Sequence, residues 1–262
     1  MYGDFAFLLS LTLRMAVSAA FVVTASIITE SSGPVIGALI ATLPLSAGPA
    51  YVFLALDHNA TFIAKGAQAG LAINAATMAF CLTYVALAQR SNAIISVGGA
   101  VVVWIALAAL EGLVTWTLFG GVLANAMAFA ICIPLFRRFQ HVEKVPLVAH
   151  YWYDIPLRAT MVAALVAVVV SSSHWVGPFV SGAIALFPTV LFSMMVILHV
   201  RIGGRTTAAM IANGGWAMMG FGFAIAVLQV TAIPLGSALA LSLALTTCIV
   251  WNLALWWLGR KR

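Results

Sequence analysis

The sequence has very little charge. Only 7% of its 262 residues are charged, with 12 Lys and Arg against 6 Asp and Glu, and 64% are hydrophobic. A water-soluble domain is typically about a quarter charged and about half apolar, so this composition excludes an ordinary soluble fold. Apolar runs of roughly 20 residues, the length that crosses a bilayer as a helix, follow one another along the whole chain. We therefore predict an all-α polytopic membrane protein without a soluble domain.

Cysteine is scarce, and the short motifs of common catalytic and metal sites are missing. The three cysteines lie in apolar runs without metal-ligand spacing. The sequence has no phosphate-binding glycine loop, no HExxH or CxxC and no GxSxG turn. We therefore expect no enzyme activity, no catalytic residues, no metal and no cofactor. The basic residues lie mainly in predicted loops, where they set membrane topology, so the positive charge gives no reason to expect nucleic-acid binding.

Turn and charge signals divide the chain into nine predicted transmembrane helices. Their approximate ranges are 5–29, 35–56, 62–89, 93–110, 113–136, 156–173, 177–200, 206–230 and 233–258. Nine spans place ten of the twelve Lys and Arg on one face, with Arg14 and Lys65 as the exceptions. The positive-inside rule makes that face cytoplasmic. We expect a multi-pass protein of the bacterial inner (plasma) membrane, with the N-terminus outside and the C-terminus in the cytoplasm.

Two parts of the chain resemble each other. Residues 14–44 align without a gap to residues 158–188 at an offset of 144, and nine of the 31 positions are identical. The informative identities are Arg14/Arg158, Gly33/Gly177, Pro34/Pro178 and Pro44/Pro188, and the same offset pairs Gly70 with Gly214. This pattern indicates an internal duplication.

The duplication predicts the domain organisation. Residues 1–110 form a first four-helix repeat, residues 111–155 a linking helix with a cytoplasmic interfacial loop, and residues 156–262 a second repeat. Because one extra crossing separates the copies, they would be inverted about an axis in the membrane plane. A single Glu-Gly pair is the only turn signal within 93–136. If 113–136 did not cross fully, the repeats would be parallel.

The repeated prolines indicate where a site would lie. Pro44 is about ten residues into its predicted helix, which at roughly 1.5 Å per residue lies near the middle of the bilayer, and Pro188 is its counterpart. Proline removes a helical hydrogen bond, and such a break at membrane depth requires protein or a water-filled cavity beside it. In the Gly33-Pro34 and Gly177-Pro178 pairs, we expect glycine to end one helix and proline to begin the next.

Other polar residues are weaker candidates for binding or gating. A charge at Arg14, inside the predicted first helix, indicates function unless it reaches the surface or pairs with Asp4 or Asp57. Arg158 matches Arg14 but lies near the predicted cytoplasmic surface, where it equally fits a role in topology. The remaining candidates are Glu30 and His174, which precede the two Gly-Pro pairs and fit gating, proton coupling or ordinary loops, and Asn74 and Asn213, expected as buried amides that line a cavity or link helices.

These features favour a small secondary transporter or exporter that works by alternating access. We expect a small organic solute as its substrate, with a weak preference for a negative group because of Arg14. Membrane lipids are its expected surroundings, and a coupling proton or ion and a homo-oligomer are compatible with it. The alternative is a non-catalytic membrane subunit or scaffold that packs against proteins or lipids. Tight protein contact at Pro44 and Pro188, with no polar cavity, would favour the scaffold.

Overall fold

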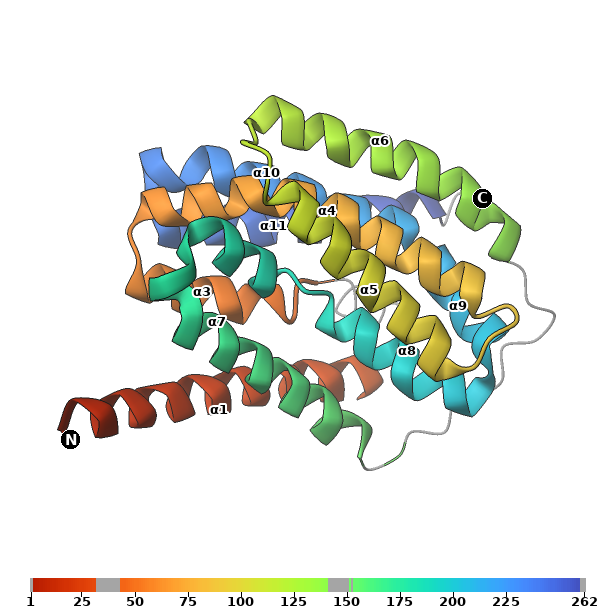
Figure 1. The fold of residues 1–262 in the computed structure, drawn as a ribbon, viewed down its shortest axis with the longest axis horizontal. Coiled ribbons are helices and arrows are strands. Elements are labelled where there is room, and N and C mark those ends of the chain that lie inside the picture. The colour runs from red at the N-terminus through yellow and green to blue at the C-terminus, as the bar shows by residue number, and fades with distance from the viewer. Residues whose placement is uncertain (1, 32–42, 141–150, 152, 260–262) are drawn as a thin grey trace.

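The structure is a computed structural model, and it describes residues 2–31, 43–140, 151 and 153–259. Within these residues there are ten α-helices, one 3-10 turn and no strand. The elements are α1 (Tyr2–Ser31), α3 (Ala47–Asp57), α4 (Ala60–Leu87), α5 (Ala93–Glu111), α6 (Leu118–Phe136), η1 (Arg137–Phe139), α7 (Asp154–Ala185), α8 (Thr189–Ile202), α9 (Gly204–Asn213), α10 (Gly215–Leu235) and α11 (Ser237–Gly259) (Figure 1).

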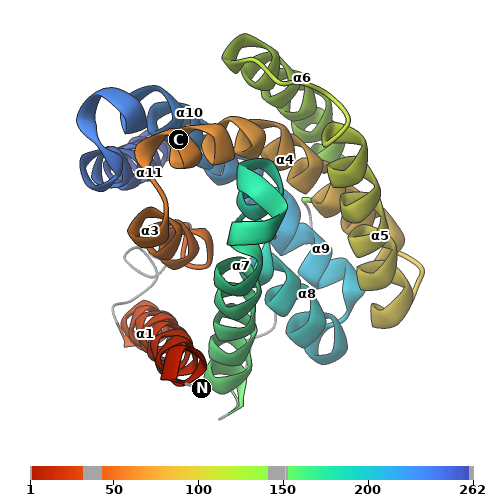
Figure 2. The same ribbon diagram turned by 60° about the vertical axis from the view of Figure 1, so that its left-hand side comes forward.

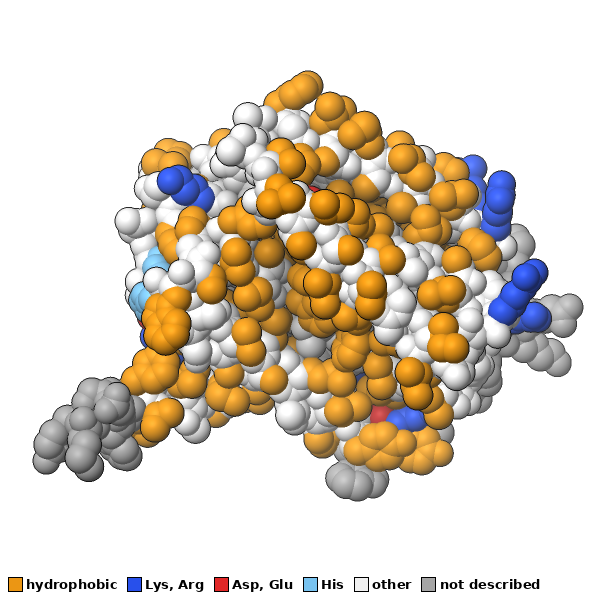
Figure 3. Space-filling view, in the orientation of Figure 1, with side chains coloured by type: hydrophobic (Ala, Val, Ile, Leu, Met, Phe, Trp, Pro, Cys, Tyr) orange, Lys and Arg blue, Asp and Glu red, His pale blue; other side chains and the backbone are white. Residues whose placement is uncertain are grey.

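Seven of the described helices are long and apolar enough to cross a membrane: α1, α4, α5, α6, α7, α10 and α11. Large hydrophobic side chains lie exposed along them, which suits a lipid surrounding, and orange side chains cover much of the face in Figure 3. The structure therefore agrees with the prediction of an all-helical membrane protein. It does not confirm nine full spans, because the apolar helices α3 and α8 have only 11 and 14 residues.

The two predicted spans that contain Pro44 and Pro188 are not continuous helices. Residues Leu43–Ser46 are non-helical, and α3 covers only the last part of the predicted span 35–56. The predicted span 177–200 begins inside α7 and continues in α8 after a break at Leu186–Pro188. Both breaks follow from proline, which cannot donate the backbone hydrogen bond of a helix interior.

Two other predicted boundaries differ from the structure. The predicted break at Ile233-Pro234 is wrong, because α10 includes Pro234 and ends at Leu235. The chain turns instead at Gly236, whose φ of +80° favours glycine. The predicted helix 206–230 is divided into α9 and α10 at Gly214.

Helix α4 lies at the centre of the molecule. In the most apolar 18-residue stretch of α4, 67% is buried inside the molecule, against 22–33% in the corresponding stretches of the other six candidate spans. It packs against α5, α6, α7 and α10, while α11 packs on α10 and α1 packs on α7. Figure 2 shows α3 between α1 and α11, on the side of the molecule away from α5.

Two helix starts recur at the spacing of the sequence alignment. Helices α4 and α9 begin at Ala60 and Gly204, and α5 and α11 begin at Ala93 and Ser237, 144 positions apart in both cases. In Figure 1 the long helices share a common direction, so their ends gather at two ends of the molecule. Most of the Lys and Arg side chains visible in Figure 3 lie at the end where α4 and α6 finish.

Candidate functional site

The two proline breaks have the same backbone turn. The amide of Leu45 donates to the carbonyl of Leu43, and that of Thr189 donates to that of Phe187, both at 2.7 Å. One turn later, the carbonyls of Pro44 and Pro188 accept from residues four positions on, both at 2.8 Å. Pro188 has φ −76° and ψ 60°, the values of an inverse γ-turn. Each proline therefore lies in a short non-helical segment that leads into a short helix.

A cavity of about 730 Å³ contacts both breaks. It lies among α1, α3, α10 and α11, and its walls include Pro44 from the first break and Leu186 from the second. Its volume lies within the range of small-molecule sites, roughly 300–1,000 Å³. The walls are almost entirely apolar, and their side-chain hydroxyl groups belong to Ser18, Tyr51, Ser237 and Ser242.

Tyr51 is the unusual polar group of this cavity. The residue is 4% exposed, and within the described part of the chain its hydroxyl has no hydrogen-bond partner. Buried tyrosine hydroxyls usually find a partner, and an unpartnered one loses stability. The hydroxyl is itself buried against Gly66 and Gly70 of α4, so a ligand or an ordered water would reach it only after a local movement of the chain.

Behind Tyr51 and Leu186, the backbones of α4 and α7 pack closely against each other. A Cβ atom added at Gly182 of α7 would lie 2.6 Å from the carbonyl oxygen of Gly66 in α4. A Cβ atom added at Gly70 would overlap the side chain of Leu186 and lie 3.5 Å from the hydroxyl of Tyr51. The glycines thus allow α4 to contact α3, α7 and the second break at once.

The break before α8 is filled with aromatic rings instead of being hollow. The ring of Phe187 lies 5.1 Å from that of Trp104 in α5 and 6.5 Å from that of Phe80 in α4, both edge-on. Phe192 of α8 lies 5.7 Å away on another side. Such edge-to-face contacts add packing energy to the burial of the rings. The structure therefore has one hollow and one filled proline break.

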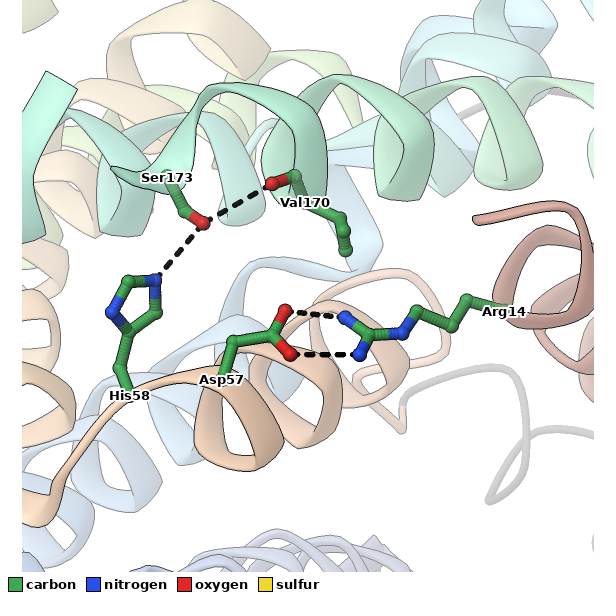
Figure 4. A network of polar contacts seen from close by, with 5 residues as sticks. All are labelled: Arg14, Asp57, His58, Val170 and Ser173. Atoms are coloured by element: carbon green, nitrogen blue, oxygen red, sulfur yellow. Dashed lines mark hydrogen bonds and ion pairs between the residues drawn. The ribbon is translucent and has the colours of Figure 1, made fainter. Parts of the chain in front are cut away.

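Arg14 forms an ion pair with Asp57 (Figure 4). Both guanidinium nitrogens donate to the carboxylate, Nη2 to Oδ1 at 2.7 Å, and the pair joins α1 to the end of α3. The guanidinium also lies over the ring of Phe53, 5.7 Å from its centre. Asp57 is one of the two partners predicted for Arg14, and the bidentate geometry satisfies the charge of Arg14 inside the chain.

A histidine group lies beside this ion pair. The hydroxyl of Ser173 of α7 lies 2.9 Å from Nε2 of His58, with which it shares a hydrogen bond, and 3.2 Å from the carbonyl of Val170. The ring of His58 stacks on that of Phe62, and the ring of His174 is 4.7 Å away. His174, a sequence candidate, thus lies close to His58, which sequence reasoning did not select.

A second ion pair, not predicted from the sequence, lies near the opposite end. Arg201 of α8 donates to both carboxylate oxygens of Asp154 at the start of α7. The rings of Tyr151 and Tyr153 lie 4.3 and 4.9 Å from the Arg201 guanidinium carbon. A signal for this pair was present, because Arg201 occupies the position 144 residues after Asp57.

The amide candidates lie in different environments. Asn74 is 3% exposed and donates to Asn125 of α6 at 3.0 Å, while Asn125 donates back to the carbonyl of Leu71. Asn213 is exposed, so the expectation that it is buried is wrong. Because α9 ends there, the side chain reaches the carbonyl of Gln140. The structure does not bring Asn74 and Asn213 to a common cavity.

The remaining candidates concern the two Gly-Pro pairs and their surroundings. Gly177 kinks α7 with φ +75° and ψ 175°, and Pro178 begins the short helical part after it. Arg158 is half-buried, one turn after Asp154. The Glu30 side chain and residues Gly33 and Pro34 lie outside the described residues.

No group of three or more His, Cys, Asp or Glu that could hold a metal ion occurs in the described part of the chain. Comparison with known proteins gives no family, curated relative or solved structure that matches this chain.

Proposed function

We propose that this protein is a small secondary transporter or exporter with two inverted repeats, which moves a small organic solute by alternating access. The observation that carries the proposal is the cavity of about 730 Å³ whose walls include both proline breaks. Substrate sites of inverted-repeat transporters lie near the midplane, where discontinuous helices meet. In a bacterium, the chain would lie in the inner membrane with the basic end of Figure 3 toward the cytoplasm.

Three observations support an inverted duplication. The turns at Pro44 and Pro188 share their hydrogen bonds. Helix starts recur 144 positions apart. The long apolar helix α6 lies between the halves and supplies the odd crossing that an inverted arrangement requires.

The contrast between the two breaks supports alternating access. The helices α1, α3, α10 and α11 line a hollow that is open on one side, whereas the break at Phe187 packs on α4 and α5. In a transport cycle these two arrangements would exchange, since a protein with two conformations can respond to a ligand that prefers one of them.

The cavity favours a largely apolar solute with one polar group. Its walls are mostly aliphatic, and the unpartnered hydroxyl of Tyr51 would recognise the polar group once a local movement exposes it to the cavity. Arg14 is neutralised by Asp57, so the ion pair removes the basis for preferring a negative group. A coupling proton would be sought at His58 and His174, which lie together beside this ion pair.

A membrane scaffold is the second candidate, because the cavity has few polar groups. The amides of Asn74 and Asn125 bond to each other, and the charges of Arg14 and Asp57 pair within the chain. Such interhelical bonds serve helix packing without any ligand. A scaffold would leave the cavity to lipid chains.

A thermal-shift screen on purified protein tests the proposal. The panel contains small apolar alcohols, organic anions and organic cations, and a ligand that binds only the folded state must raise the denaturation temperature. The Ala244→Trp variant fills the cavity, and Val102→Trp, on the exposed face of α5, is the matched control.

The transporter proposal expects a shift with apolar alcohols that survives Val102→Trp and disappears in Ala244→Trp. Loss of the shift in Tyr51→Phe would identify the polar contact. If no class of compound shifts the wild-type protein, the scaffold becomes the better account.

A further inference from the structure

We propose that the Arg14–Asp57 and Asp154–Arg201 ion pairs are the two gates of this transport cycle, one toward each end of the molecule, and that they open in turn. The inference rests on the proposed function. It assigns gating roles to Asp57, Asp154 and Arg201, which are not among the gating residues predicted from the sequence.

The two pairs occupy corresponding places with their charges exchanged. Asp57 and Arg201 are 144 positions apart, and each lies at the end of the short helix that follows a proline break. Their partners lie on α1 and α7, where Asp154 is one turn before Arg158, the counterpart of Arg14. Each pair therefore fastens a short helix to the long helix that begins the same half of the chain.

The Arg14–Asp57 pair borders the cavity directly. Ser18 lines the cavity, and its hydroxyl donates to the carbonyl of Arg14 at 2.8 Å. Phe53 lies under the guanidinium, and Leu56 precedes Asp57; both also line the cavity. When this pair separates, α3 is released from α1 at the end of the hollow space.

The two pairs are not held equally well. Asp57 lies at the C-terminus of α3, where the helix dipole disfavours a carboxylate. Asp154 lies at the N-terminus of α7, where the dipole favours it, and it also accepts from the amide of Tyr151 at 3.1 Å. Two tyrosine rings shield Arg201, whereas one phenylalanine ring lies near Arg14. The Arg14–Asp57 gate should therefore open more readily, which agrees with its place beside the hollow break.

The test measures labelling of single cysteines by a membrane-impermeant thiol reagent in vesicles of known orientation. The reporters are Ser18→Cys on α1 and its counterpart Val162→Cys on α7, both 0% exposed in this structure. The native cysteines are 0–5% exposed, so their background reaction is small. Thr61→Cys and Arg90→Cys, at exposed sites next to opposite ends of α4, report which side the reagent reaches.

Neutralising one gate should expose one reporter from one side. Asp57→Asn should raise the labelling rate of Ser18→Cys from the Thr61 side by about fivefold or more, the lower end of usual couplings, and leave Val162→Cys unchanged. Asp154→Asn should raise labelling of Val162→Cys from the Arg90 side only, by a smaller factor. The exchanged pair Arg14→Asp with Asp57→Arg should restore the slow rate.

Equal acceleration of both reporters by either variant would mean general loosening and would overturn the proposal. Unchanged labelling in both variants would overturn it as well. This test is independent of the ligand screen. Side-specific labelling without any ligand shift would support the gates and contradict the proposed binding of a small solute. A ligand shift without side-specific labelling would support the binding cavity and contradict the gates.

Discussion

The short helices α3 and α8 follow prolines that are 144 positions apart, yet the surroundings of α3 are hollow and those of α8 are filled. Both helices follow a proline turn with the same backbone hydrogen bonds. Around α3 lie the cavity and the unpartnered hydroxyl of Tyr51, whereas Phe187 before α8 packs against Phe80 and Trp104. The same local turn therefore occurs in two packing arrangements, which is what the proposed alternating access would require.

The largest expected effect comes from the glycine crossing of α4 and α7. In Gly182→Ala, the new methyl group would meet the backbone of Gly66, which cannot move away without shifting α4. We expect destabilisation of about 3 kcal/mol, the upper end of usual overpacking effects, measured as a lower denaturation temperature.

Gly98→Ala is the control, because no atom lies within 4 Å of the added Cβ. It should be neutral or stabilise α5 by up to about 1 kcal/mol through helix propensity. Equal effects of Gly98→Ala and Gly182→Ala would contradict the close crossing.

The same substitution should have different effects in the two regions. Ala100→Leu places a larger side chain at a fully buried position of α5, one turn before Trp104, and should cost about 1–3 kcal/mol. Ala244→Leu points into the hollow region and should be neutral or stabilising, because it fills empty space. Thermal denaturation of both variants checks this, and a larger loss for Ala244→Leu would argue that the cavity is not empty in the folded protein.

The smallest expected effect is a pH dependence at His58. Burial and the neighbouring His174 lower the pKa of His58 below its usual value, and Asp57 only partly offsets them. The unfolded chain therefore binds this proton more tightly, so stability should fall as the pH drops below about 6.5. In His58→Gln the decrease in denaturation temperature between pH 7 and pH 5 should be smaller, and an identical decrease would exclude His58 as its source.

The parts of the fold and of the site that could be predicted from the sequence depend on the local properties of single residues. Pro44 and Pro188 predict their breaks because proline acts on its own backbone, and Gly177 predicts the kink in α7 for the same kind of reason. The charge of Arg14 led to Asp57 as a possible partner, because a charge in a membrane helix needs one.

What the sequence did not show depends on three-dimensional packing. The hollow and the filled regions both consist of aliphatic and aromatic residues, so composition does not distinguish them. The isolation of the Tyr51 hydroxyl depends on how α3 lies against Gly66 and Gly70. Asn213 reads as a buried amide in an apolar run, and its exposure follows only from the end of α9.

The most direct test of the central claim is a pair of spin-label distances across the two regions. The pair Leu56→Cys and Leu239→Cys spans α3 and α11. The pair Val200→Cys and Ile95→Cys spans α8 and α5, and each of its positions is 144 residues from its counterpart in the first pair. All four sites are 55–78% exposed. We predict two distances for each pair, with the hollow state having the long α3–α11 and the short α8–α5 distance. Ala244→Trp should leave only that state, and one unchanged distance for each pair in both proteins would contradict alternating access.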